Sequence, residues 1–322
     1  MAEIFVESWA PEYGTPLLPD DDLADPQVDE SVEVSGDWEP IAGVDDGIER
    51  VAFVDGVRRV DARLTLIGDE GPVPGLCGTH AVGAVTWDRT SHVSEVSVVR
   101  LERLALFSAG AAAPMPTTSG TAVSGRLDYR TESVAENDPG ALIQRFHGSM
   151  RKAEAVVSEE LAQAGSFVIA DGPINDLSAT EKVGYIKSHR VFYLSPARAG
   201  IIGLLTPGSR TPLFLIGAGG AYPRYSWYVK LAEVPGGHDW SGVARAELSS
   251  HLDARTARTV ADRTTALLPF VASPLHVDPR APQNLVPIAA LERELRRHMG
   301  DPAFVYRALR EAAMRQSAGV AQ

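Results

Sequence analysis

The sequence predicts an α/β fold in which a mixed sheet is flanked by helices, and three observations lead to this prediction. Between Ile48 and Phe107, apolar and polar residues alternate over several segments, as they do in strands with one buried face. From Asp138 to about Ala164, apolar residues recur at helical spacing instead. A short apolar run follows that helix directly. Strands, one long helix and a further strand in this order favour a single elaborated α/β domain.

The first 45 residues are predicted to form an irregular acidic arm. They are rich in Pro, Asp and Glu and show little periodicity. Residues 46–322 contain the periodic segments, and neither an internal repeat nor a Pro/Gly/Ser linker divides them. We therefore expect one domain over 46–322, with a core over about 48–250 and a C-terminal helical part over about 251–318.

The predicted core begins with a strand over residues 51–54, which ends in Asp55 and Gly56. Alternation predicts further strands at 60–67 and 92–107, and a continuous apolar run predicts another at 81–87. Asp138 and Pro139 then mark the start of the long helix, and Gly165 marks its end. The remaining elements are expected as strands at 167–171, 183–186, 213–216, 227–231 and 243–248, and as helices near 255–270, 288–298 and 303–315.

The composition predicts a folded protein of the cytoplasm. Of the 322 residues, 44% are hydrophobic and 22% are charged, which is enough apolar material for a large core. The apolar runs are too short to cross a bilayer, and the start does not resemble a secretion signal, so no membrane insertion is expected. The single cysteine, Cys77, excludes an internal disulfide and a zinc site of several thiolates.

The charge balance argues against a protein that coats nucleic acid. The formal net charge is -12, whereas coating proteins use a broad basic surface to release counterions. An enzyme that handles DNA at one site remains compatible with this charge. Clustered carboxylates add negative charge there, and a bound cation returns positive field to the site.

Two aspartates at predicted strand ends, Asp55 and Asp171, are candidate metal ligands. The order of strands and helix is the outline of the ribonuclease-H-like fold, in which the first strand and the strand after the helix are neighbours. Both aspartates would then emerge at the same edge of the sheet. Phosphodiester hydrolysis needs such convergence, because carboxylate oxygens hold two Mg²⁺ or Mn²⁺ ions roughly 3.5 to 4 Å apart. Either Asp-Gly pair alone is more often a plain turn.

The long helix offers a third carboxylate, Glu154. At about 100° per residue, Glu154 borders the apolar stripe made by Met150, Val157 and Leu161. A glutamate beside a buried stripe costs desolvation energy unless it is paired or binds a cation. The alternative is a solvated glutamate paired with Arg151.

Four basic residues are candidates for contacts with a phosphate. Arg58 and Arg59 could contact the DNA backbone, although two arginines at the start of a strand are usually surface charge. Lys187, with Arg190 close by, could neutralise the scissile phosphate and so act in catalysis. The alternative is that Lys187 and Arg190 lie at an exposed strand end.

Taken in order, these motifs resemble those of the NurA nucleases. The resemblance rests on Phe-Val-Asp-Gly at 53–56, on Glu154, and on Val-Ile-Ala-Asp-Gly at 168–172. The runs 184–187 and 227–231 look like later strands of the family, so the resemblance covers about 48–297.

The resemblance implies a metal-dependent DNA nuclease, acting as an exonuclease or an endonuclease. Asp55, Glu154 and Asp171 would bind Mn²⁺ or Mg²⁺. Relatives form homodimers docked on a HerA-type hexameric DNA-translocating ATPase, in DNA-end processing or phage defence, and the same partners are expected here.

The sequence departs from the family at two places. Val57 stands where the first motif commonly has a serine, which is not an obligate metal ligand. Where relatives carry Tyr-Pro and then a histidine near the metal, this chain has Ala-Pro-Gln-Asn-Leu at 281–285 and Ala289. His276 or Asp278 could substitute as a ligand, the alternative being that His276 is structural, or three carboxylates could suffice. The rival hypothesis is therefore a non-catalytic adaptor that binds the ATPase.

Overall fold

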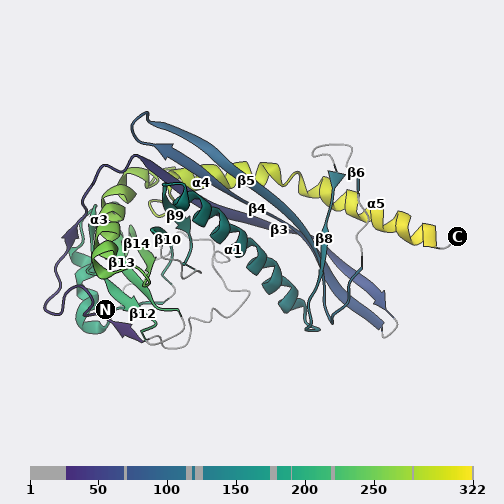
Figure 1. Ribbon diagram of the computed structural model, residues 1–322, viewed down its shortest axis with the longest axis horizontal. Helices are drawn as coiled ribbons and strands as arrows, with labels where there is room; N and C mark the ends of the chain where they lie inside the picture. The colour runs from purple at the N-terminus through teal and green to yellow at the C-terminus, as the bar shows by residue number, and fades with distance from the viewer. Residues whose placement is uncertain are drawn as a thin grey trace. The chain divides into compact units, whose positions relative to one another are not determined.

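The computed structural model describes residues 27–68, 71–113, 118–119, 126–174, 180–189, 191–218, 222–277 and 279–320. It confirms a mixed α/β architecture with a large mixed sheet and flanking helices (Figure 1). The chain divides into two compact units. The first unit comprises Met1–Val54, Val85–Glu95 and Ser158–Ala290, and the second comprises Asp55–Ala84, Val96–Val157 and Leu291–Gln322. Among the described residues, no helix is long and apolar enough to span a membrane.

The sheet of the first unit is mixed. Its hydrogen-bonded order is β1 (Val28–Asp29), β12 (Phe214–Ile216), β13 (Arg224–Lys230), β14 (Val243–Ser249), β10 (Lys182–Ile186), β9 (Phe167–Asp171) and the first residues of β3 (Arg50–Gly68). β9 runs parallel to both β10 and β3, whereas the other pairs in this unit are antiparallel. The predicted pairing of the first core strand with the strand after the helix is therefore confirmed.

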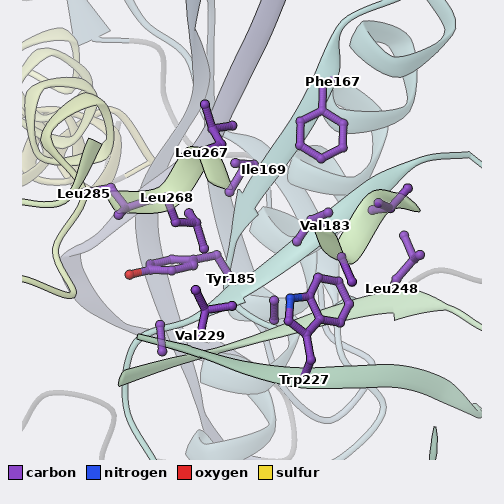
Figure 2. Packing of buried hydrophobic residues seen from close by; sticks show 14 of the residues in the cluster. Phe167, Ile169, Val183, Tyr185, Trp227, Val229, Leu248, Leu267, Leu268 and Leu285 are labelled. Atoms are coloured by element: carbon purple, nitrogen blue, oxygen red, sulfur yellow. The ribbon is translucent and has the colours of Figure 1, made fainter. Parts of the chain in front are cut away.

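A helix packs on one face of this sheet. Side chains from alternate positions of the strands, among them Phe53, Ile169, Tyr185 and Trp227, form the core together with α3 (Ala254–Val271). Figure 2 shows Leu268 of α3 lying against the Tyr185 ring. Each large apolar side chain buried in this way contributes roughly 1.5 to 3 kcal/mol. This core holds β3, β9 and β10 in fixed register.

Part of the expected arm lies on the first unit. β1 extends the sheet, and β2 (Ile41–Ala42) pairs with β11 (Ser209–Arg210). Glu33 makes a buried ion pair with Arg210 at 2.8 Å, which ties this segment to the body of the unit. Residues 1–26 of the expected arm lie outside the described residues. A short helix α2 (Pro196–Ala199) and a 3-10 helix (Gly200–Leu204) complete this unit.

Long strands form the sheet of the second unit, in the order β3, β4 (Gly71–Asp88), β5 (Val93–Phe107) and β8 (Arg130–Ser133) (Figure 1). The prediction that the first strand ends at Asp55 is wrong, because β3 continues to Gly68 and absorbs the strand expected at 60–67. Gly56 does not adopt a positive φ, so its backbone makes no turn of that kind. β6 (Thr118–Ser119) and β7 (Arg126–Leu127) form a separate pair.

Helices pack on both faces of the long strands. The predicted long helix is confirmed as α1 (Pro139–Gln163), and its Phe146 packs over Gly78, where any larger residue would collide with the ring. Side chains of α5 (Pro302–Val320), including Val305, pack with Cys77 and Ala105 instead. Because Ala105 and Leu106 alternate along β5, the α5 cluster and the α1 cluster lie on opposite faces. α4 (Val286–His298) precedes α5 in the chain.

Candidate metal centre

Strand register brings Asp55 and Asp171 side by side. β3 and β9 are parallel, with Val54 opposite Ala170, so the next residue of each strand is an aspartate. Alternation places both side chains on the face that carries Phe53. Asp55 is buried, and its Oδ1 accepts a hydrogen bond from the Gly56 backbone N–H at 2.8 Å. The order of elements predicted this approach of two carboxylates.

Glu292 of α4 supplies a third carboxylate. One oxygen each from Asp55, Asp171 and Glu292 lies within 4.8 Å of the other two. Like charges held this close destabilise each other unless a cation or a proton intervenes. Hard carboxylate oxygens are the donors that Mg²⁺ and Mn²⁺ prefer, so this donor set fits a divalent cation.

Buried apolar neighbours position Glu292 on its helix. Ile288 lies four residues before Glu292 and Leu295 three residues after it, and both are fully buried. Glu292 therefore borders the buried stripe of α4, where a carboxylate needs a partner. Arg296 lies 3.2 Å away on the next turn, but its side chain is largely exposed.

Lys187 holds a positive charge at this group of carboxylates. Its Nζ lies 2.6 Å from Oδ2 of Asp171 and donates to Oδ1 of Asn284 at 3.2 Å. The side chain of Lys187 is 2% exposed, so the alternative of an exposed strand end is wrong for this residue. β9 and β10 pair with Asp171 opposite Tyr185, which places Lys187, two residues on, beside Asp171.

Glu154 lies on the other side of β3 from the Asp55 side chain. Its carboxylate and the Met150 side chain pack directly on Gly56, where any Cβ would collide with Glu154. Gly56 points to the α1 side because residues alternate along β3, and Arg58 shares that side. Among the described residues, the close group of carboxylates contains Glu292 and not Glu154.

Basic side chains surround Glu154. Partial burial and repulsion from Arg151 lower the pKa of Arg58, while the attraction of Glu154 opposes this shift. Burial, together with repulsion from Arg58 and Arg151, lowers the pKa of His147 to about 4. His147 and Arg151 are one helical turn apart on α1, so the two side chains and Arg58 converge on the same face.

The remaining predicted residues lie elsewhere. Arg59 donates to Asp61 at 2.7 Å and to the carbonyl oxygens of Gly300 at 2.7 Å and Met299 at 3.2 Å, just beyond the end of α4. His276 is exposed and does not belong to the carboxylate group. Arg190 and Asp278 lie outside the described residues.

Sequence reasoning missed Glu292 and Asn284. The signal for Glu292 was available, because it borders an apolar helical stripe in the same way as Glu154. No sequence pattern marks Asn284, which is fully buried in an irregular segment.

No family model matches the sequence, and no curated protein matches it. Among solved structures, the chain is similar to the crystal structure of the NurA nuclease from Sulfolobus solfataricus, with 11% sequence identity and a TM-score of 0.41. The match covers 80% of this chain and 84% of that chain. A likeness this distant does not indicate a function. The chemistry of the centre is indicated instead by its carboxylates and by Lys187.

Proposed function

We propose that the protein is a metal-dependent DNA nuclease with a ribonuclease-H-like core. The observation that supports this proposal is the convergence of Asp55, Asp171 and Glu292, whose oxygens form a donor set for a divalent cation. The parallel pairing of β9 with β3 fits the strand order of that fold. The order of motifs that resembles the NurA nucleases suggests DNA as the substrate.

The residues of the centre have separable roles in this proposal. Asp55, Asp171 and Glu292 hold Mn²⁺ or Mg²⁺, which when bound supplies Lewis-acid chemistry for phosphodiester hydrolysis. Lys187 keeps one positive charge fixed at Asp171, where it favours the extra negative charge of the transition state. Glu154 lies on the α1 side of β3, where its negative charge attracts Arg58.

The charge distribution supports DNA binding by the second unit. This unit carries 16 basic residues against 14 acidic ones, although the whole chain has a net charge of -12. Arg58 and Arg151 lie close enough to repel each other, and a phosphate group placed between two such guanidinium groups relieves the repulsion. We therefore assign Arg58 to DNA contact, whereas the hydrogen bonds of Arg59 give it a structural role.

Cleavage of linear DNA in the presence of Mn²⁺ tests the proposal. Wild-type protein is expected to cleave, and the Asp55→Ala and Asp171→Asn variants are expected to lose activity, while Asp37→Ala, an exposed aspartate of the first unit, keeps it. Activity that survives both substitutions at the centre would exclude this site.

The same assay separates the nuclease from the adaptor. The resemblance to the NurA nucleases implies a HerA-type ATPase as a partner, so the reactions are repeated with a cognate hexameric ATPase. The expected homodimer is tested by sedimentation. Binding to the ATPase without cleavage under any condition favours the adaptor hypothesis. That hypothesis rests on Ala289, which stands where the family has its late histidine.

A further inference from the structure

Lys187 occupies one side of Asp171 in a way that resembles a bound cation. Its ammonium contacts Oδ2 of Asp171 at 2.6 Å, and its side chain is 98% buried. Both residues belong to the first unit, and the parallel pairing of β9 and β10 places them side by side. A buried lysine in contact with a carboxylate is costly to move, because either charge left alone would be desolvated without a partner.

Asn284 fixes the position of the ammonium. Its Oδ1 accepts from Lys187 Nζ at 3.2 Å, and its backbone oxygen accepts a hydrogen bond from Ser273 Oγ. The neighbouring carbonyl of Gln283 accepts from the Tyr185 hydroxyl at 2.7 Å. Figure 2 shows the Tyr185 ring in the core of the first unit. The segment that departs from the family pattern is therefore anchored to β10, the strand that ends directly before Lys187.

A two-ion centre commonly uses both oxygens of a carboxylate to bridge its ions. Here one oxygen of Asp171 already faces an ammonium, which repels a second divalent ion at the same position. We propose that Lys187 takes the place of the second ion, so that the centre holds one divalent cation per chain. Asn284 acts as the positioning residue for Lys187. This inference rests on the proposed nuclease function.

Metal stoichiometry tests the inference without any measurement of activity. Mn²⁺ is titrated into the full-length, metal-free protein by calorimetry, and the loaded protein is examined by electron paramagnetic resonance. We expect one Mn²⁺ per chain with an uncoupled signal. Two ions per chain with a spin-coupled signal would overturn the inference.

Substitutions test whether Lys187 limits the centre to one ion per chain. Lys187→Met removes the charge and keeps a long side chain, so it is expected to bind two ions per chain. Asn284→Leu is expected to admit a second, weaker ion, because the ammonium loses its amide partner. Ser226→Ala, which removes a different buried hydrogen bond, is the matched control and should keep one ion. A Lys187→Met variant that folds and still binds one ion contradicts the proposal. If it does not fold, the wild-type stoichiometry decides.

DNA cleavage is scored separately, so the two failures can be distinguished. If the chain binds two coupled ions and cleaves DNA, the one-ion inference is wrong and the proposed nuclease function is supported. If it binds one ion and does not cleave DNA, the nuclease function is wrong and the one-ion inference is supported. The absence of any Mn²⁺ binding overturns the inference, and the cleavage assay then decides on the function alone.

Discussion

The identity of the third metal ligand is the sharpest prediction, because sequence and structure point to different glutamates. Sequence reasoning chose Glu154, whereas the close group of oxygens contains Glu292. We predict that Glu292→Gln weakens Mn²⁺ binding strongly and that Glu154→Gln changes it by less than about threefold. The lost ligand charge matters only for the glutamate that contacts the ion.

The expected magnitude follows from charge and distance. A unit charge about 4 Å from a divalent ion interacts by about 8 kcal/mol at an effective dielectric constant of about 20. Dehydration of the carboxylate cancels much of this energy. We expect roughly 3 kcal/mol to remain, which is about a 100-fold loss of affinity. In characterised metal sites, loss of a residue that hydrogen-bonds to a metal ligand already costs about 10- to 100-fold in affinity, so loss of a ligand itself is expected to cost at least as much.

Calorimetric titration of Mn²⁺ measures both affinities. Glu294→Gln is the matched control, because it changes a partly exposed glutamate of the same helix. Thermal melting in the absence of metal verifies that each variant folds. If Glu154→Gln weakens Mn²⁺ binding as much as Asp171→Asn does, and Glu292→Gln leaves it unchanged, the assignment from the structure is refuted.

Three further predictions concern the rest of the fold. Burial raises the pKa of the Cys77 thiol to about 12, so a thiol reagent at pH 8 should modify Cys77 only after unfolding, and fast modification of the folded chain contradicts this burial. The lowered pKa of His147, about 4, means that the unfolded state binds more protons between about pH 4 and 6.5, so stability should fall as the pH falls through this range. His147→Gln should flatten the pH dependence of the free energy of unfolding measured with urea. If the variant and the wild type show the same pH dependence, the assignment to His147 is wrong. Glu247 is fully buried between Arg224 and Arg245, at 3.0 and 2.8 Å, so Glu247→Ala should cost about 3 to 5 kcal/mol in urea unfolding, and a loss below about 1 kcal/mol would count against this account.

Local sequence patterns are sufficient to predict the order of elements and the approach of the two aspartates. Alternation and helical spacing are local signals, so the strand at 167–171 and the helix that became α1 could be located from neighbouring residues. Once β9 was expected beside β3, Asp55 and Asp171 had to emerge together. The extent of β3 was not determined, because an Asp-Gly pair is compatible with both a turn and a continuing strand.

The side chains that complete the centre could not be predicted from local patterns, because they come together through packing of distant segments. Glu154 and Glu292 both border apolar helical stripes, and no local pattern shows which one reaches the aspartates. Residues alternate along β3, so Gly56 faces the side opposite Asp55, and the Glu154 carboxylate of α1 packs on that side. Glu292 comes from a helix far along the chain. The bond from Lys187 to Asn284 likewise joins residues 97 positions apart. Such pairings depend on how distant segments pack, which periodicity within one segment does not encode.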